Sequence, residues 1–411
     1  TMIKDAKTPF GTYTPDNFDR EFAGPLSATN ALIHSRNIPA ILLAKDLEKP
    51  NFYEFLKSTG IPLNTDPKHY GLSLVLGTAE TTLEELVQLY SMLANQGEYR
   101  KINKLLVSRD NDGLKLMSPE SSYLTLEMLS HNPLPASGSK KWSLQYKAVP
   151  WKTGTSMAFK DAWSIAVFDR YALGVWIGNF AGESNQAFVG RDAAGTLLFE
   201  LIEAMSALKP LEYKFSGYES DLNISEVDVC AISGRLPHKD CRHKKTSLFI
   251  PGKSPIELCA VHRRLEIDIK TGLQVCPKFS GPRKSKVYEF WPSDILKLYK
   301  QVGVARKIPP GFHPQCKSFS HGDIPPKITS PKENIIYSLR TKGSDSKRVP
   351  FKVIADGSVK MVSWFLNNKY LGESGVSEPF VWTANTGRHQ LQVVDDQGRW
   401  AYLDFQVQQV D

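Results

Sequence analysis

A short run of residues, Lys152-Thr153-Gly154-Thr155-Ser156, combines a cationic side chain with hydroxyl groups around a glycine. The run follows apolar, strand-like residues and precedes a predicted β-hairpin, so it would lie on a strand or at its end. Lys-Thr-Gly at a strand edge is typical of enzymes that transfer acyl groups through a serine. The three residue types are common, however, and a lysine in an ordinary turn is the structural alternative. The run alone does not decide between the two.

A second set of candidate residues lies well upstream. Residues 26–47 predict a helix, a polar break at Ser35-Arg36-Asn37, and a second helix with Pro39 near its first turn. Ser-x-Asn between two helices belongs to the same kind of enzyme. Serine and asparagine also favour helix caps, because their side chains bond to free backbone groups. Ser35 and Asn37 are therefore capping candidates as well, and the two roles are compatible.

The elements around these motifs are mixed α and β. Thr82-Leu83-Glu84-Glu85 is a capping-box pattern, and apolar residues at helical spacing follow it up to Gly97. Further helices are predicted near residues 118–130 and 193–205. Two apolar runs, 162–168 and 171–177, flank a polar break and predict an antiparallel hairpin. The first part of the chain is therefore expected to be an α+β domain.

The composition and the hydrophobic pattern of the chain change twice after this domain. Residues 213–322 are rich in Pro, Gly, Cys and Lys with little sustained periodicity, and they predict a connector with one helix near residues 291–302. Residues 323–411 alternate between apolar and polar positions, with turns at Asn367-Asn368 and Gln397-Gly398, and they predict a small all-β sandwich. The predicted domains are thus 1–212, 213–322 and 323–411.

Composition and charge indicate which classes of binding partner to expect. Lys and Arg number 51 against 43 Asp and Glu, a net charge of +8. Much of the excess lies in short clusters at 242–245 and 283–286, for which a solvated surface is preferred over contact with an anionic polymer or lipid headgroups. No nucleic-acid motif accompanies them, so a nucleic-acid partner is not expected. No apolar stretch is long enough to span a membrane, and residues 1–4 lack a signal-peptide layout, so we expect any export signal or anchor upstream of Thr1.

Longer segments carry a resemblance to a known family. The segment FGTYTPDNFDREFAGPLSATNAL, then SRN and KTGTS in that order, then DAWSIAVFDRYALGVWIGN and LFIPGKSP resemble class A penicillin-binding proteins of the 1C type. PPKITSP, WFLNNKYLG and VVDDQGRWA resemble the small C-terminal domain of that type. The resemblance implies a transpeptidase domain like those of penicillin-binding proteins and serine β-lactamases, here incomplete, followed by the cysteine-containing connector and the sandwich.

The resemblance also implies a reaction. In this family a serine in Ser-x-x-Lys attacks the D-alanyl-D-alanine of a peptidoglycan stem peptide, releases D-alanine, and passes the acyl group to an amine of another stem. β-Lactams stop the enzyme at the acyl stage. Ser35 would relay a proton toward the leaving nitrogen, Asn37 would hold the substrate amide, and Lys152 would supply positive charge for the substrate carboxylate.

The remaining residues of Lys-Thr-Gly-Thr receive roles by the same resemblance. The hydroxyls of Thr153 and Thr155 would bind the carboxylate, and the backbone N–H of Thr155 would be one of two oxyanion donors. Gly154 would leave room for the substrate against the strand. No cofactor is expected, and stem peptides and β-lactams are the expected ligands.

The sequence departs from the family at the nucleophile. No Ser-x-x-Lys precedes Ser35, and the later matches that begin at Ser137, Ser206 and Ser344 come in the wrong order, so we interpret them as chance. We expect a soluble and by itself inactive C-terminal piece of a bifunctional enzyme at the periplasmic face of the bacterial inner membrane. The nucleophile, a glycosyltransferase domain and the membrane anchor would lie upstream. The alternative is a non-catalytic protein that grips peptidoglycan or a partner through a degenerate transpeptidase fold.

Two features of the back half remain open to interpretation. The sandwich would dock a periplasmic protein partner or only stiffen the end of the chain, and docking is preferred because transpeptidation needs no separate terminal domain. All five cysteines lie in the back half. Cys259-x-x-His262, with His238, Cys241 and His243, is a candidate zinc site, but its spacing is irregular and an exported protein is oxidised. We therefore predict no metal and two disulfides, Cys230 with Cys241 and Cys259 with Cys276, leaving Cys316 free.

Overall fold

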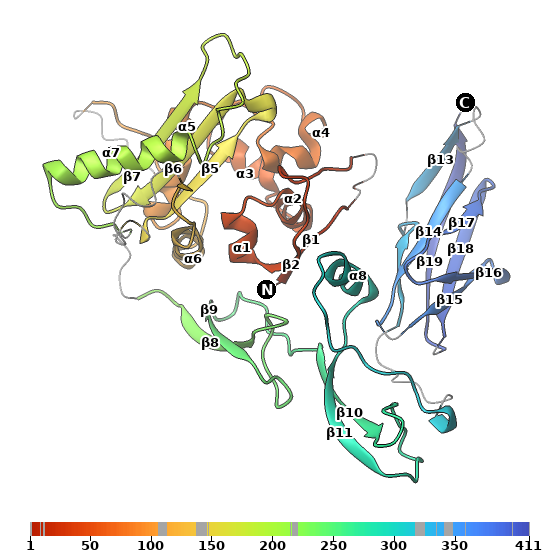
Figure 1. Cartoon of the computed structure of the whole chain (residues 1–411). Coiled ribbons are helices and arrows are strands. Elements are labelled where there is room, and N and C mark those ends of the chain that lie inside the picture. The colour runs from red at the N-terminus through yellow and green to blue at the C-terminus, as the bar shows by residue number, and fades with distance from the viewer. Residues whose placement is uncertain are drawn as a thin grey trace. The chain divides into compact units, whose positions relative to one another are not determined.

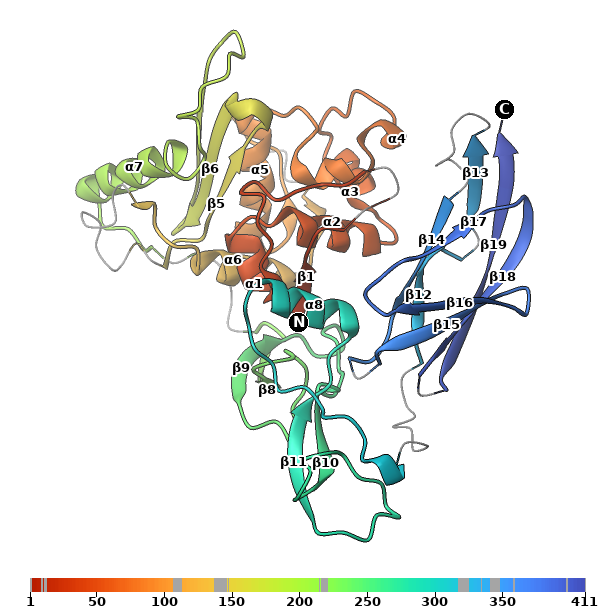
Figure 2. The ribbon, with the colours of Figure 1, turned by 45° about the vertical axis from the view of Figure 1, so that its right-hand side comes forward.

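The computed structural model describes the chain except for residues 1, 9, 11–12, 106–112, 137–145, 147, 214, 216–220, 317–324, 334, 341–347, 358, 397 and 411. The chain divides into two compact units. The first comprises Thr1–Val227 and Thr246–Pro255, and the second comprises Asp228–Lys245 and Ile256–Asp411. Figures 1 and 2 show the helices and strands of both.

The first unit is built around an antiparallel sheet of β5 (Trp151–Thr155), β6 (Asp161–Phe168) and β7 (Tyr171–Gly178), in the order β5-β6-β7. Helix α7 (Ala194–Leu208) covers one face through a buried cluster of Trp151, Phe168, Leu198, Phe199 and Ile202 (Figure 2). Helix α5 (Leu83–Ala94) packs on the other, where Val167 meets Met92 and Leu93. The sheet is thus buried on both faces, and β5 remains an edge strand.

Local signals fix these elements as predicted. The Thr82 hydroxyl accepts a bond from the Glu85 N–H and the Glu85 carboxylate accepts one from the Thr82 N–H, which is the expected capping box. Helix α6 (Pro119–Ser130) begins after the Ser118 cap, and β6 and β7 form the predicted hairpin. Gly174 allows α5 to approach β7, because a Cβ there would lie 2.5 Å from Val87 Cγ2.

The remaining elements of the first unit surround this sheet. None of the helices that the structure describes is long and apolar enough to cross a membrane. The elements are β1 (Met2–Asp5), β2 (Gly24–Ser27), α1 (Ala28–Ile33), α2 (Asn37–Asp46), α3 (Phe52–Ser58), α4 (Pro67–Tyr70), η1 (Gly71–Leu76), β3 (Glu98–Tyr99), β4 (Leu114–Lys115) and η4 (Met157–Phe159).

The cysteine-containing part of the second unit has more regular structure than the single helix predicted from the sequence. Strands β10 (His262–Asp268) and β11 (Arg283–Glu289) form one pair. Strands β8 (Ser225–Cys230) and β9 (Lys244–Phe249), each of which begins or ends in the first unit, form another. Helix α8 (Ser293–Gln301) is the predicted helix, and η5 (Pro314–Cys316) follows. Three small buried clusters replace a single large core.

The end of the second unit consists of two sheets that share one apolar core. Phe351 and Trp364 are fully buried in that core, and the turn at Asn367-Asn368 joins two antiparallel strands as predicted. One sheet has the order β12-β14-β17 and the other β13-β19-β18-β15-β16. The strands are β12 (Lys327–Ser330), β13 (Ile336–Arg340), β14 (Arg348–Ile354), β15 (Met361–Leu366), β16 (Lys369–Gly375), β17 (Phe380–Thr383), β18 (Gly387–Asp395) and β19 (Trp400–Val410).

Candidate active site

Ser35 lies in the tight turn that ends α1. The Ser35 N–H donates to the Leu32 carbonyl at 3.1 Å and the Arg36 N–H donates to the Ala31 carbonyl at 2.9 Å, which is a Schellman ending. This ending needs a left-handed residue after the helix, and Ser35 has φ +51°. Its side chain makes no cap, since the bonds that close the helix come from the backbone. The hydroxyl is therefore available for other partners.

Lys152 lies on the edge strand β5 and reaches Ser35. Its Nζ donates a hydrogen bond to the Ser35 hydroxyl, 117 residues away in sequence, and another to the Thr153 carbonyl at 2.8 Å. The bond brings together the two motifs to which the family resemblance assigns one site. Burial of the ammonium, with a smaller contribution from the nearby Arg191 guanidinium, lowers the pKa of Lys152 to about 8.

On the side of β5 that faces away from β6, no strand that the structure describes pairs with the backbone groups, and the Thr153 carbonyl there accepts the bond from Lys152 Nζ. The Val167 N–H donates to the Pro150 carbonyl, and the Ser156 N–H donates to the Asp161 carbonyl. Because backbone groups along a strand point alternately to opposite sides, Thr153 and Thr155 direct theirs away from β6. The Thr155 N–H therefore faces the open edge of the sheet. An extended peptide has the right groups to pair with this edge.

Gly154 and Thr155, which follow Thr153, have different surroundings. The Thr155 hydroxyl accepts a bond from the Gly190 N–H at 2.9 Å, and its own O–H can still donate. Gly154 is exposed, and a Cβ there would make only an ordinary contact of 3.6 Å with Trp163. Packing within the protein does not require a glycine at this position. The absence of a side chain at Gly154 instead leaves space for a ligand against β5.

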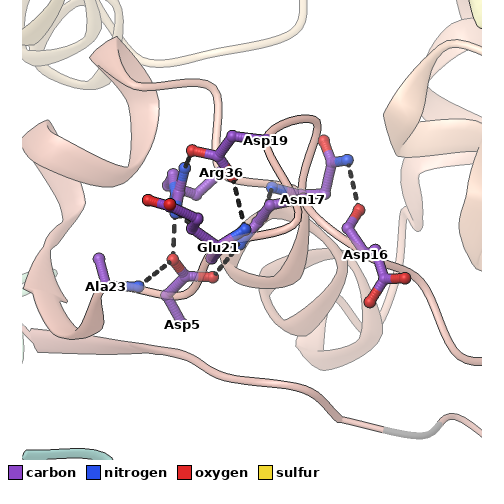
Figure 3. A network of polar contacts seen from close by, with 8 residues as sticks. Asp5, Asp16, Asn17, Asp19, Glu21, Ala23 and Arg36 are labelled. Carbon is purple, nitrogen blue, oxygen red and sulfur yellow. Dashed lines mark hydrogen bonds and ion pairs between the residues drawn. The ribbon is translucent and has the colours of Figure 1, made fainter. Parts of the chain in front are cut away.

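Asn37 begins α2 and bonds to Asp16 and Asn17. These two residues belong to the polar network around Arg36 (Figure 3). The Asn37 backbone N–H donates to Asn17 Oδ1 at 2.8 Å, and its side-chain amide donates to the Asp16 carbonyl at 2.9 Å. Both bonds described for Asn37 thus go to the segment before α1, not to Ser35 or Lys152. Its carbonyl oxygen Oδ1 is the part of the side chain left to meet a ligand.

The centre of this network is the fully buried carboxylate of Asp5. It accepts bonds from Arg36 Nε at 2.8 Å, Asn17 Nδ2 at 2.7 Å and the Ala23 N–H at 2.9 Å. Arg36 also donates a hydrogen bond to Asp19. Burial alone would raise the pKa of Asp19. Hydrogen bonds, among them the one from Arg36, and the charge of Arg36 outweigh this effect and hold the pKa below its usual value. Arg36, the central residue of Ser-x-Asn, therefore anchors the turn that carries Ser35 and Asn37. Sequence reasoning missed it because its partners are distant in sequence.

Arg191 is a second residue that the sequence did not single out. Its guanidinium donates to the Pro133 carbonyl at 2.7 Å and to Asn132 Oδ1 at 2.7 Å, and it lies 5.2 Å from the Trp151 ring. A longer bond of 3.3 Å reaches the Ile33 carbonyl at the end of α1. Arg191 therefore joins the Ser35 turn to the beginning of β5. No spacing rule links it to either motif.

The later Ser-x-x-Lys patterns were interpreted as chance matches. In the pair that the structure describes, the Ser206 hydroxyl donates to the Glu203 carbonyl, and Lys209 bonds to the hydroxyl of Tyr171. Serine and lysine thus have separate partners and form no nucleophile–base pair. The patterns at Ser137 and Ser344 lie outside the described residues.

The predicted disulfides are wrong. Cys276 is bonded to Cys316, with a Cα–Cα distance of 5.6 Å, and Cys230, Cys241 and Cys259 are free thiols. The fold of the second unit brings Cys276 to a residue 40 positions away. The three free thiols instead gather around His262.

Comparison with known proteins agrees with the motifs. Residues 316–405 match the model of the Penicillin-Binding Protein C-terminus Family, and residues 222–264 match that of the penicillin-binding protein 1A C-terminal domain. Penicillin-binding protein 1C of Escherichia coli is 27% identical over 99% of this chain and 53% of its own length. Penicillin-binding protein 1A of Clostridium tetani is 26% identical over 61% of this chain and 34% of its own length.

A solved structure, penicillin-binding protein 1A from Haemophilus influenzae, aligns with 63% of this chain and 45% of its own at a TM-score of 0.48 and 18% identity. The chain spans about half the length of the penicillin-binding protein 1C that it matches. The sequence match extends over both units, and the two family models fall in the second half of the chain. By the sequence matches and the two family models, the chain is similar to class A penicillin-binding proteins.

Proposed function

We propose that this chain supplies the Ser-x-Asn and Lys-Thr-Gly parts of a serine D-Ala-D-Ala transpeptidase that acts in peptidoglycan biosynthesis. The observation that carries the proposal is the hydrogen bond from Lys152 to Ser35, which joins two motifs 117 residues apart. The stem peptide would lie along the open edge of β5, with its carboxylate at Lys152 and the hydroxyls of Thr153 and Thr155. Ser35 would pass a proton toward the leaving nitrogen, Asn37 Oδ1 would accept from the substrate amide, and the Thr155 N–H would bind the oxyanion.

The proposal assigns the acylated serine to sequence outside this chain. No Ser-x-x-Lys precedes Ser35, and acylation needs a hydroxyl with an adjacent base. In the natural gene product this serine, a glycosyltransferase domain and a membrane anchor would precede Thr1, and the protein would work at the periplasmic face of the inner membrane. Residues 323–411 would form a β-sandwich that docks a protein partner, and the two sheets with their common core support that fold.

Fluorescent-penicillin labelling tests this function. We expect no covalent adduct on this chain and a stable adduct on the same chain extended upstream through Ser-x-x-Lys, read on a denaturing gel and by intact mass. In the extended protein, Lys152→Ala should abolish most labelling. Lys160→Ala is the matched control, because Lys160 is an exposed lysine of the β5–β6 connection, and it should label normally.

Two outcomes would overturn parts of the proposal. An adduct on the present chain that maps to Ser35 or Ser137 would show that the nucleophile is assigned wrongly. An extended protein that folds and binds peptidoglycan without labelling would favour the non-catalytic binding protein. That alternative gives no chemical reason for Ser35 to meet Lys152.

A further inference from the structure

Four potential metal ligands meet in the second unit. The Sγ atoms of Cys230, Cys241 and Cys259 and a ring nitrogen of His262 all lie within 4.8 Å of one another. They are the one such group of His, Cys, Asp or Glu side chains found within the described part of the chain. All three cysteines are buried, and Trp291 and Tyr299 pack in the same cluster.

The nitrogen–sulfur distances within the group fit a tetrahedral metal site. His262 Nδ1 lies 3.5 Å from Cys230 Sγ, 3.6 Å from Cys241 Sγ and 3.5 Å from Cys259 Sγ. Zinc–sulfur bonds of about 2.3 Å and zinc–nitrogen bonds of about 2.0–2.1 Å, at the tetrahedral angle, separate sulfur from nitrogen by about 3.6 Å. The three observed distances agree with that value.

Hydrogen bonding does not account for this arrangement. A neutral imidazole offers one acceptor nitrogen, and the lone pair of that nitrogen lies in a single direction. It accepts one S–H donor well and cannot accept three at once. A cation at the centre of the group, by contrast, contacts all four atoms simultaneously.

Backbone hydrogen bonds position two of the four ligands, Cys230 and Cys259. Cys230 begins a tight loop. The Cys230 N–H donates to the Arg235 carbonyl, and the Gly234 N–H donates to the Cys230 carbonyl. Leu236 bridges to the second ligand segment, because its N–H donates to the Glu257 carbonyl and its carbonyl accepts from the Cys259 N–H. These bonds bring Cys259 beside Cys230.

An ion pair ties the remaining two ligands together. The buried Asp240, which precedes Cys241, accepts a bond from Arg264 Nε at 2.9 Å, and Arg264 lies two residues after His262. Three thiolates and one zinc ion sum to one negative charge, and Arg242 and Arg263 flank the ligands in sequence.

We propose that Cys230, Cys241, Cys259 and His262 bind one structural zinc ion. Three cysteines and one histidine are a usual ligand set for structural zinc, and four protein ligands leave no open position for a substrate. Binding releases the three thiol protons to solvent, and no oxidant or reductant takes part. The site does not depend on the proposed transpeptidase function, because its ligands all belong to the second unit.

Metal analysis of the full chain, purified without added chelator, tests the site. We expect one zinc per chain, and Co²⁺ in its place should give tetrahedral d–d bands and a thiolate-to-cobalt charge-transfer band. Loss of a residue that only hydrogen-bonds to a metal ligand lowers metal affinity about 10- to 100-fold. Cys259→Ser removes a ligand itself and should lower the zinc affinity by more than that. It should also remove about one third of the charge-transfer intensity, because two of three thiolates remain.

Two further variants separate loss of the ligand from loss of the fold. His262→Cys keeps four ligands and should retain one zinc, whereas His262→Ala should not. Replacing both Cys276 and Cys316 with alanine removes the disulfide and should leave the zinc content unchanged. A folded chain that binds no zinc when micromolar Zn²⁺ is supplied would overturn the proposal, as would alkylation and mass analysis that finds a disulfide among Cys230, Cys241 and Cys259.

Discussion

The site around Ser35 and the group around His262 are assembled in opposite ways. Ser35 and Lys152 are 117 residues apart and meet because a buried sheet and the Asp5–Arg36 network hold their elements. The ligands around His262 lie within a short stretch of chain and are held by tight turns, with only a small apolar cluster behind them. One region relies on long-range packing and the other on local backbone bonds.

This contrast explains the distribution of cross-links. The first unit buries large side chains such as Trp151 and Phe199 and contains no cysteine, since all five follow residue 229. The cysteine-containing part of the second unit has three small clusters, which supply little hydrophobic stabilisation. A disulfide, and by our inference a zinc ion, compensate for the missing core.

The largest expected effect comes from removing Arg36. In Arg36→Ala the buried Asp5 loses its cation, and an uncompensated buried charge costs about 3–5 kcal/mol of stability. Urea unfolding of the first unit measures this loss. Arg100→Ala is the control, since Arg100 pairs with Glu98 at the surface and its removal should change little. Equal losses in the two variants would contradict the importance of the network.

The second effect concerns the disulfide. Replacing Cys276 and Cys316 together with alanine should cost about 2–4 kcal/mol, because the bond closes a 40-residue stretch of chain. Hydrogen exchange read by mass spectrometry should show faster exchange in β10 and β11 and no change in β5 to β7. Faster exchange in both units would mean that their stabilities are coupled. It would contradict the view that the two units are stabilised independently and in different ways.

A smaller effect follows from the lowered pKa of Lys152. The unfolded chain holds the Lys152 proton up to about its ordinary pKa of 10.5 and the folded chain only to about 8, so folding is disfavoured while the ammonium is charged. Stability should therefore rise with pH between about 8 and 10.5. Lys152→Gln should remove this contribution. We expect the difference in unfolding free energy between wild type and variant to change with pH only in that window, and a constant difference would contradict the lowered pKa.

The smallest effect is electrostatic and comes from Arg191. Arg191→Gln should raise the pKa of Lys152, measured by the pH dependence of its acylation with an amine-reactive reagent. The pKa should stay below 10.5, because burial is the larger cause. Arg191→Lys keeps the charge and should leave the pKa unchanged. A shift of the same size in both variants would instead point to a packing role.

Short-range patterns explain what the sequence predicted correctly. The Thr82 capping box and the β6–β7 hairpin depend on neighbouring residues, and both are present. The helix–break–helix around Ser35 is present as well, with α1 ending at Ile33 and α2 beginning at Asn37. Periodicity and caps are sufficient for such elements.

Partners chosen by the tertiary fold were not predictable in the same way. Nothing near Arg36 in the sequence points to Asp5, and nothing near Arg191 points to Asn132. The contact between Lys152 and Ser35 was expected from motifs and a family resemblance rather than from spacing. The cysteine pairing was not predictable either, because the long connection from Cys276 to Cys316 carries no local signal.

The left-handed backbone at Ser35 limits which hydroxyl amino acid can stand there. A β-branched side chain at φ +51° is strongly disfavoured, so threonine is a poor replacement despite having the same functional group. Thr153 and Thr155 lie on a strand, where β-branched residues are favoured. Glycine or asparagine would suit the turn at position 35 but would bring no hydroxyl. The backbone conformation thus favours serine at position 35 and threonine at positions 153 and 155. Exchanging serine and threonine would keep the hydroxyl group but would place it on an unfavourable backbone at position 35.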